Sequence, residues 1–438
     1  MPPKDFFDNL DAELDGDYLR GEAIKIYYLD QASATPLNPH AIPSLLRFGS
    51  PDAFANPSAP YSLGRDVRLD YLEAKNRIAH YIGAKAHDLI ITSGATESNA
   101  LACSVLSPDG EALLGALEHP SMVVAASEAA SRVILPREMR DKDQTITISA
   151  PVKRIKTIKA KKSGLLDLED LRAKITDKTE LISVSLADGE LGIIQPLSKI
   201  AEIIREERKR RLENHNLRPL YFHADASQAL THYQFTVSRL GVDMMTMGSA
   251  KIGGPHGVGV LYHSPRTKIT PLIPGGGQEN GLRGGTENLA GVAGFLSAMN
   301  SGYKDFKENQ RLDAQIVQDL RTGLQKSVIP PLFLGDKKHQ LPNFCPVSFP
   351  GVDAERLIFI LEKYNVFVST GAACAASKGE KSAALKAIGL SDAEIQGSLR
   401  LSVGPMLDPE DASQAAWLIC RAVEEEARRI GLKGAKNA

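Results

Sequence analysis

The chain alternates short apolar runs with longer amphipathic segments, and this alternation constrains its fold more than any other feature. The apolar runs are rich in β-branched residues and include DLIITS (88–93), ELISVSLA (180–187), LYFHADAS (220–227) and GVGVLYH (257–263). Segments with a helical period follow several of them, such as PLSKIAEIIREERKRRLE (196–213). Strands that alternate with helices in this way predict an α/β fold with a mostly parallel sheet. Ligands bind such sheets at the carboxyl ends of the strands, so candidate site residues are sought there.

The pattern changes after about residue 300. A long charged helical segment (303–327) is followed by short strand-like runs, a second amphipathic segment (353–365) and a C-terminal helical segment (410–430). Helices grouped with short strands in this order predict a second, smaller α+β domain.

Composition narrows the functional classes. The 438 residues carry a net charge of −1, which provides no general field for binding nucleic acid or an anionic membrane. The N-terminus is acidic and no apolar run approaches the roughly 20 residues of a membrane span, so we expect a soluble, cytoplasmic protein. The four cysteines are widely spaced, which argues against a disulfide framework or a metal site: Cys103, Cys345, Cys374 and Cys420.

Two basic clusters stand out in this neutral chain. The first, KRIKTIKAKKSG, covers residues 153–164, and the second, REERKRRLENHN, covers residues 205–216. We interpret them as a solvated loop or hairpin and as a charged helix end, with the docking of a partner as the alternative.

The segment IITSGATESNALA (90–102) reads as a strand, a turn and a helix. Gly94 permits a tight turn, after which Ala95 and Thr96 offer backbone N–H groups at a helix N-terminus, where the helix dipole favours an anion. A phosphate is one possible ligand. The alternative is that the Ser and Thr residues only cap the helix.

Asp225 ends one predicted strand, and Lys251 follows the next strand in TMGSAKIGGPHGVG (246–259). A buried aspartate more often caps a helix, but this pairing suits pyridoxal 5′-phosphate (PLP). A lysine amine condenses with the PLP aldehyde, and an aspartate keeps the pyridine nitrogen protonated. The helix start after Gly94 would then bind the phosphate.

Taken together, the motifs resemble those of the cysteine desulfurases, in the class V aminotransferase family of PLP fold type I. The resemblance extends from about residue 27 to about residue 425 and depends on the order of its motifs. These include YYLDQASATPLNP (27–39), ITSGATESNALA (91–102), LEHPSM (117–122), FHADASQAL (222–230), MGSAKIGGPHGVGVLY (247–262), GGGQENGLRGGTENLAG (275–291), VSTGAACAAS (368–377) and GSLRLSVGP (397–405).

The resemblance implies a large domain (38–298) with a mostly parallel seven-stranded sheet. It also implies an N-terminal arm (1–37) that contributes to the small domain, and a small C-terminal domain (299–438) that carries the catalytic cysteine and the carboxylate-binding arginine. The length of the segment after Cys374 resembles that of the iron-sulfur-assembly subgroup.

Residue roles follow from the same resemblance. Lys251 would form the Schiff base, Asp225 would bind the pyridine nitrogen and Gln228 the ring hydroxyl, while His119 would stack on the ring and assist proton transfer. Three residues would contact the phosphate in the same subunit, and one would reach the cofactor of a second subunit in a homodimer. They are Ala95, Thr96 and Ser249 in the first group and Thr286 in the second.

The implied reaction converts L-cysteine to L-alanine. Cys374 would take the substrate sulfur as a persulfide for delivery to an acceptor protein, either an iron-sulfur scaffold or a tRNA-thiolation carrier, and Arg400 would bind the substrate carboxylate. No metal and no direct contact with nucleic acid are expected. A buried, inert thiol is the alternative for Cys374 and a surface ion pair the alternative for Arg400.

The chain departs from the family pattern at two places. Gly248 and Ala250 replace a serine and a histidine before the lysine, and Gly189 replaces an asparagine that helps to bind the substrate carboxylate. Two alternatives therefore accompany the desulfurase hypothesis. One is a related PLP enzyme, such as a selenocysteine or cystine lyase or an aminotransferase, and the other is a degenerate homologue that acts as a scaffold.

Overall fold

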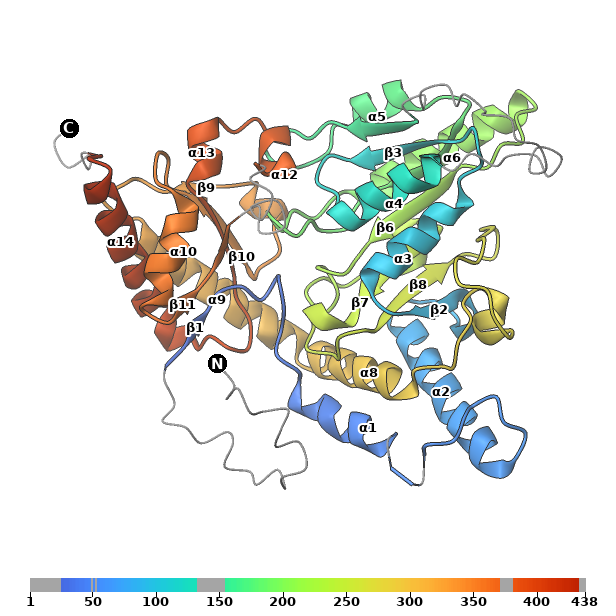
Figure 1. The fold of residues 1–438 in the computed structure, drawn as a ribbon. Helices are drawn as coiled ribbons and strands as arrows, with labels where there is room; N and C mark the ends of the chain where they lie inside the picture. The colour runs from blue at the N-terminus through green and yellow to red at the C-terminus, as the bar shows by residue number, and fades with distance from the viewer. Residues whose placement is uncertain (1–24, 49, 52, 132–153, 371–380, 433–438) are drawn as a thin grey trace, which may run out of the picture.

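The computed structural model describes residues 25–48, 50–51, 53–131, 154–370 and 381–432 (Figure 1). Two β-sheet assemblies lie side by side, the larger formed by the first three hundred residues and the smaller by the C-terminal third together with the start of the described chain. No helix in these ranges is long and apolar enough to cross a membrane.

Seven strands form the large sheet, which confirms the expected α/β fold. Their order is β2 (Leu89–Thr92), β8 (Gly259–His263), β7 (Met244–Gly248), β6 (Tyr221–Asp225), β5 (Thr179–Ser183), β3 (Glu111–Gly115) and β4 (Ile155–Ile158). Only β8 runs antiparallel to its neighbours, β2 and β7. The carboxyl ends of the other six strands therefore lie along one edge of the sheet.

Successive side chains of each strand enter different cores, because a strand alternates its two faces. Leu113, Ile182 and Phe222 pack on one side of the sheet, whereas Leu114 and Leu181 pack on the other. Helices cover both faces, which explains why the strands are apolar along their whole length. They are α1 (Ile42–Arg47), α2 (Ser62–Tyr81), α3 (Ala95–Ala102), α4 (Pro120–Ser131), α5 (Leu168–Lys174), α6 (Leu197–Glu213), α7 (Val237–Leu240) and α8 (Leu289–Lys304).

The first basic cluster is not simply a loop or hairpin, as the sequence suggested. Residues 155–158 form β4, which pairs in parallel with β3 at the edge of the large sheet. Ile158 is completely buried, and Lys156 pairs with Glu111 across the strands, Nζ to Oε2 at 2.7 Å. A lysine on an edge strand keeps its open side in water, while Ile155 and Ile158 pack into the apolar cores on the two faces of the sheet.

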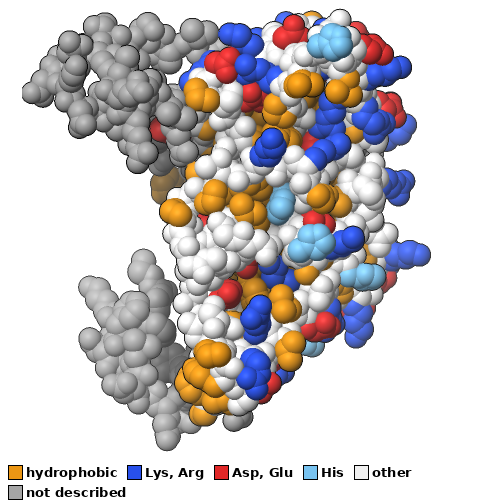
Figure 2. Space-filling model, turned by 90° about the vertical axis from the view of Figure 1, so that its right-hand side faces the viewer, with side chains coloured by type: hydrophobic (Ala, Val, Ile, Leu, Met, Phe, Trp, Pro, Cys, Tyr) orange, Lys and Arg blue, Asp and Glu red, His pale blue; other side chains and the backbone are white. Residues whose placement is uncertain are grey.

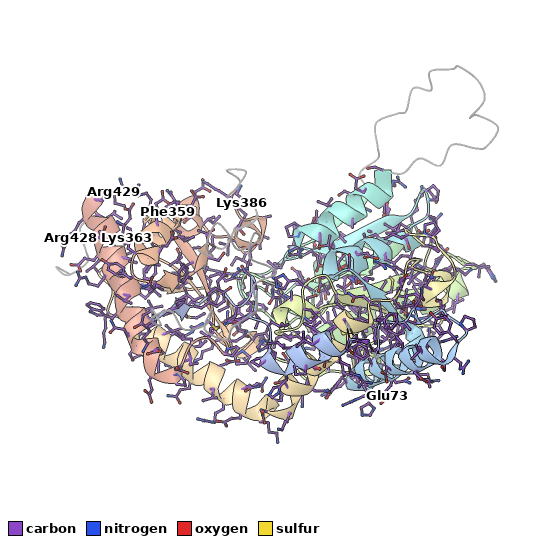
Figure 3. The ribbon with its side chains drawn as sticks, turned by 60° about the horizontal axis from the view of Figure 1, so that its bottom comes forward. Glu73, Phe359, Lys363, Lys386, Arg428 and Arg429 are labelled. Carbon is purple, nitrogen blue, oxygen red and sulfur yellow. The ribbon has the colours of Figure 1, made fainter. Side chains whose placement is uncertain are left out.

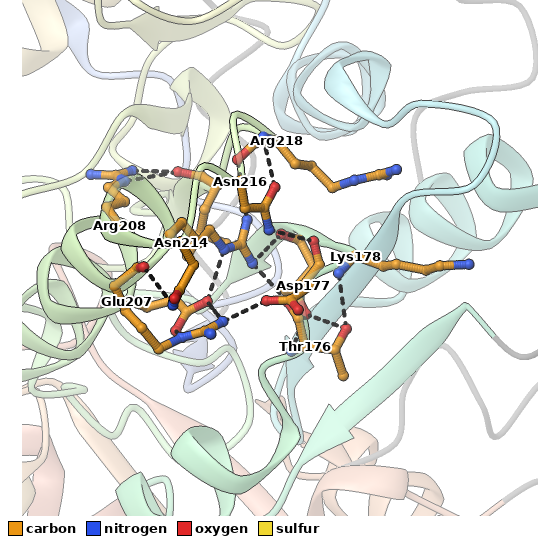
Figure 4. A network of polar contacts seen from close by, with 12 residues as sticks. Thr176, Asp177, Lys178, Glu207, Arg208, Asn214, Asn216 and Arg218 are labelled. Atoms are coloured by element: carbon orange, nitrogen blue, oxygen red, sulfur yellow. Dashed lines mark hydrogen bonds and ion pairs between the residues drawn. The ribbon is translucent and has the colours of Figure 1, made fainter.

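The second basic cluster does form a charged helix end, at the C-terminus of α6 (Figure 4). Arg210 contacts Asp177 at 2.5 Å, and the buried Arg211 binds Glu207 at 2.8 Å and the carbonyl oxygens of Thr176 and Thr179. These arginines join α6 to the start of β5. On the face in Figure 2, cationic side chains are interspersed with acidic and hydrophobic ones.

The smaller assembly has its own apolar core, which confirms the predicted α+β part. Its antiparallel sheet has the order β12 (Ser369–Thr370), β13 (Ser398–Ser402), β10 (Phe344–Ser348) and β9 (Leu332–Phe333), and β1 (Tyr27–Tyr28) pairs in parallel with β11 (Val366–Phe367). The helices are α9 (Phe306–Leu324), α10 (Ala354–Glu362), α12 (Ala383–Ala387), α13 (Asp392–Gln396) and α14 (Ala412–Arg429). Figure 3 shows Phe359 and Lys363 near Arg428 and Arg429 at one end of this assembly.

The N-terminal residues join this smaller assembly through β1. The predicted limit between the two large parts, at residues 298 and 299, falls inside α8, which is continuous from Leu289 to Lys304. The division into an arm and two domains stays a prediction.

Candidate active site

Asp225 occupies the carboxyl end of β6 and is 7% exposed. Its carboxylate accepts the N–H of Ser227 at 2.9 Å and the side-chain amide of Asn99, on α3, at 3.0 Å. No cationic side chain of the described residues forms an ion pair with it. A buried carboxylate that lacks a cation is costly, so a positively charged ligand group would stabilise it.

Lys251 follows β7 in a short 3₁₀ turn, Ser249–Lys251. Its Nζ donates a hydrogen bond to the carbonyl oxygen of Ser33, and its own carbonyl accepts from Thr35 Oγ1 at 2.9 Å. The segment around residues 33–35 therefore covers the lysine. In the sheet register Asp225 lies opposite Thr246, so the two predicted cofactor residues leave neighbouring strands at the same edge.

The start of α3 offers an anion site beside this edge. Gly94 precedes the helix with φ 147°, and no side chain caps it. The alternative that Ser or Thr side chains cap this helix is therefore wrong. The N–H groups of Ala95 and Thr96 lie in the uncapped first turn. A Cβ on Gly248 would lie 3.4 Å from that of Ala95, so a side chain at position 248 would point toward the same turn.

The hydroxyl of Ser249 packs against Gly254. This hydroxyl is enclosed and has no hydrogen-bond partner, and a Cβ on Gly254 would come within 2.0 Å of it. The geometry lends no support to a phosphate contact by Ser249 in this conformation.

His119 is linked to Asp225 through two residues that sequence reasoning missed. Its Nδ1 lies 2.8 Å from Ser121 Oγ, which accepts from Asn99 Nδ2 at 2.9 Å, and Asn99 also binds Asp225. The pKa of His119 lies below its usual value, chiefly because the surrounding protein desolvates the ring, while Asp225 opposes this effect. The positive charges of Lys251 and Arg400 lower it further, so all these groups face one site.

Arg400, on β13 of the smaller sheet, reaches into the same site and is 9% exposed. Its guanidinium donates to the carbonyl of Gly189 at 2.9 Å, to Asp30 at 2.7 Å and to Ser33 Oγ. Its Nε is enclosed without a partner. The exposed surface ion pair considered for Arg400 is therefore wrong, because this pair is largely buried between the two assemblies.

Three further candidates differ in what the structure says of them. Gln228 donates to the carbonyl of Ala32 at 2.9 Å and lies beside Gly189, so it belongs to the same cluster. Thr286 is exposed, and no described contact joins it to the other candidates. Cys374 lies outside the described residues.

A comparison with protein families gives this arrangement a context. The aminotransferase class-V model matches residues 27–414. The chain belongs to the class-V aminotransferase family.

Two relatives that are similar to most of this chain share one name. The chain is 33% identical over 404 residues to a protein of Dictyoglomus turgidum named cysteine desulfurase IscS, covering 91% of this chain and 94% of that protein. A protein of the same name from Rickettsia typhi is 32% identical over 405 residues, covering 91% of each.

Solved structures show the same similarity. A NifS-like protein from Rickettsia africae has a TM-score of 0.74 at 26% identity, covering 92% of this chain and 99% of the other. A structure of SspA in complex with cysteine has a TM-score of 0.71 at 26% identity, covering 86% and 99%.

The described residues fit the family's cofactor, PLP. Asp225 lacks the cation that a protonated pyridine nitrogen would supply, the uncapped turn at Ala95 suits a phosphate, and the amine of Lys251 follows the neighbouring strand. The family's asparagine position differs, because Gly189 contributes only its carbonyl, to Arg400.

Two carboxyl groups beside Gly189 have pKa values above their usual range. Burial raises the pKa of Asp188, although three N–H groups of its own turn hydrogen-bond to it. Burial also raises the pKa of Glu190 to about 7, against a hydrogen bond from Ser382 Oγ at 2.5 Å.

Proposed function

We propose that this protein is a PLP-dependent cysteine desulfurase, which converts L-cysteine to L-alanine and transfers the sulfur to an acceptor. The observation that carries the proposal is the convergence of Asp225, Lys251, His119 and Arg400 at one edge of the large sheet. Membership in the class-V family and the similarity to proteins named cysteine desulfurase support it.

The cofactor would be held at three points. Asp225 would keep a proton on the pyridine nitrogen, the N–H groups of Ala95 and Thr96 would bind the phosphate, and Lys251 would hold the aldehyde carbon covalently. When bound, PLP withdraws electrons from the substrate carbon next to the amino group and so weakens the bonds that must break. Gln228, which lies beside Gly189, would bind the ring hydroxyl.

Arg400 would bind the substrate carboxylate. Its Nη atoms already contact Asp30, Ser33 and the carbonyl of Gly189, so the fork is oriented before substrate arrives. The substrate carboxylate would then share Arg400 with Asp30 or displace it.

Lys251 and His119 would move the α-proton. The amine of Lys251 would take the proton from the α-carbon of the bound substrate. His119 remains neutral at neutral pH because its pKa is lowered, so its ring is available to accept a proton.

Cys374 would complete the reaction. Its thiolate would attack the substrate sulfur as the carbon–sulfur bond breaks, and the bonding electrons would stay on the carbon skeleton. The β-carbon would gain one proton, which balances the proton that Cys374 loses on ionising, and the skeleton would leave as L-alanine. The product on the protein is a persulfide. Cys345 and Cys420 are poor alternatives, because burial raises their pKa values to about 12 and about 11 and keeps them as thiols.

A homodimer would complete the site. Five exposed apolar side chains lie on α1 and α2, both of which pack on α8, and an apolar surface of this kind is typical of an interface. They are Ile42, Leu46, Leu63, Leu69 and Leu72. The exposed Thr286 would then reach the phosphate of the second subunit's cofactor.

The dimer has a specific test. A mixture of Lys251→Ala and Thr286→Ala subunits should regain activity that neither variant has alone, because one of the two sites in a hybrid dimer is intact. If mixing restores nothing although light scattering shows hybrid dimers, the sites are not shared.

We further propose a cytoplasmic protein that delivers sulfur to an acceptor protein, either an iron-sulfur scaffold or a tRNA-thiolation carrier. Cys345 and Cys420 are unpaired thiols, in keeping with a reducing compartment. A sulfide and alanine assay with and without each class of acceptor would decide between the two carriers.

The central experiment measures cofactor binding and product formation together. The purified protein incubated with PLP should show the visible absorption of a lysine-bound cofactor, and it should form alanine and sulfide from L-cysteine in equal amounts. Cys374→Ser should abolish sulfur release, whereas the matched control Cys420→Ser should retain it. A protein that never binds PLP would instead support the scaffold alternative.

A further inference from the structure

A second carboxyl group lies beside the proposed cofactor site, at Glu118. It precedes His119 on the connection between β3 and α4, and its carboxyl packs against the end of β5. Oε1 accepts the N–H of Ser185 at 2.5 Å, and Oε2 lies 3.1 Å from Ser185 Oγ and 3.4 Å from Ser183 Oγ. No ion pair of the described residues includes Glu118.

The contacts continue as a line of polar groups across three strands. Ser183 Oγ on β5 lies 2.9 Å from Nδ1 of His223 on β6, whose Nε2 lies 3.0 Å from Oγ1 of Thr246 on β7. All three side chains are completely buried. Buried polar groups are stable when each has a partner, and every member of this line has one.

The line runs beneath the proposed cofactor residue. His223 is two residues before Asp225 on β6, so the two side chains share one face of the strand. Thr246 lies directly opposite Asp225 in the register. Any charge on the line would therefore act on Asp225.

Desolvation favours the neutral form of both titratable groups on this line, Glu118 and His223. Burial lowers the pKa of His223 to about 4, against the attraction of Asp225, so its imidazole is neutral. Burial raises the pKa of Glu118 to about 8; the Ser185 N–H opposes this shift, and the negative charge of Asp225 adds to it. Lys251 and Arg400 act on the neighbouring His119 but form no ion pair with Glu118.

We propose that Glu118 is a positioning residue that works in its protonated, neutral form, closing a hydrogen-bonded line with Ser183, His223 and Thr246 beneath Asp225. The pyridine nitrogen then meets the single negative charge of Asp225. Loss of the Glu118 proton would add a second negative charge beside Asp225 and His119. This charge would raise the pKa of the pyridine nitrogen of bound PLP and so change the visible absorption of the ring. This inference rests on the proposed binding of PLP.

Glu118→Gln tests the inference because glutamine has nearly the shape of the protonated acid and cannot ionise. The visible absorption of bound PLP is followed from about pH 6 to about pH 10, together with the dissociation constant of the cofactor. We expect the wild-type spectrum to change in a step near pH 8 and Glu118→Gln to lack that step, with PLP affinity within about twofold of wild type. Ser183→Ala should move the step to higher pH, because a donor to the ionised carboxylate is lost.

Glu180→Gln is the matched control. Glu118 is partly buried against the carboxyl end of β5, whereas Glu180 is buried near the other end of β5 and pairs with Arg218 at 2.7 Å. Its variant should keep the wild-type spectral step even if its melting temperature falls. A general loss of stability is thereby separated from an effect on the cofactor.

A second measurement needs no cofactor. Asp188 and Glu190 also have raised pKa values, so the infrared spectrum of Glu118→Gln is subtracted from that of the PLP-free wild type. The difference should contain the C=O stretch of one protonated carboxylic acid at neutral pH, and this difference band should disappear above about pH 8. The inference is overturned if this band is absent, if wild type and Glu118→Gln share one spectral pH profile, or if Glu118→Gln weakens PLP binding tenfold or more. Failure of every variant to bind PLP would refute the proposed function, and the infrared band would still decide the protonation of Glu118.

Discussion

If Arg400 binds the substrate carboxylate as proposed, Asp30 would compete with that carboxylate, and Asp30→Asn tests this competition. The ion pair measures 2.7 Å between Asp30 Oδ1 and Arg400 Nη2, and its side chains are 19% and 10% exposed. Asparagine keeps an oxygen acceptor for the guanidinium but removes the charge. Arg400 then retains Ser33 Oγ and the carbonyl of Gly189 as partners, so its orientation should persist.

The magnitude follows from the burial of the pair. An exposed pair contributes up to about 1 kcal/mol, and removing one member of a fully buried pair costs about 3–5 kcal/mol. For this largely buried pair that keeps its hydrogen bonds, we expect Asp30→Asn to lower the free energy of unfolding by about 1–3 kcal/mol. In the variant the charge of Arg400 is no longer neutralised by Asp30, so its attraction for the substrate carboxylate is stronger. L-cysteine should therefore bind about 5–10-fold more tightly to the variant than to wild type.

The assay compares melting temperatures with and without a non-reactive carboxylate analogue of L-cysteine, and measures KM. Glu111→Gln is the matched control. The Lys156–Glu111 pair has the same length, 2.7 Å, and Glu111 lies at the amino end of β3, whereas the candidate site lies at the carboxyl ends of the strands. The control should lower the melting temperature without changing KM. If Asp30→Asn weakens substrate binding instead, Asp30 orients Arg400 and does not compete for it, and the reasoning is refuted.

Three further predictions follow from single contacts. Gly248→Ser should tighten PLP binding about fivefold, measured by titrating the visible absorption, because its side chain would point toward the first turn at Ala95; unchanged affinity would contradict this geometry. The acid limb of kcat/KM should lie below the usual histidine value of about 6.5, since the pKa of His119 is lowered, and an acid limb above that value would exclude His119 as its source. Arg211→Met should lower the free energy of unfolding by about 3–5 kcal/mol in urea, because Glu207 and two carbonyl groups lose a buried partner, and a change under about 1 kcal/mol would count against that role.

Local pattern was enough to predict the large sheet and the place of two candidate site residues. A strand is marked by its own apolar run, and a residue placed just after the run must lie at the carboxyl edge of a parallel sheet. Asp225 and Lys251 were predicted to lie together for this reason, and the register confirms that they leave neighbouring strands. β4 was missed because the basic residues in and around it resemble a solvated segment, and only pairing with β3 shows that Ile158 is buried.

The partners of these residues were decided by tertiary packing. Asp30 and Arg400 are separated by 370 residues, and Asn99 and Asp225 by 126, so no local period relates them. Glu118 gave no sign of an unusual proton affinity in the sequence, since that property comes from burial against β5 and from the charge of Asp225. Strand and helix propensities act over a few residues, whereas desolvation and charge depend on which distant segments pack together, both within the larger assembly and between the two assemblies.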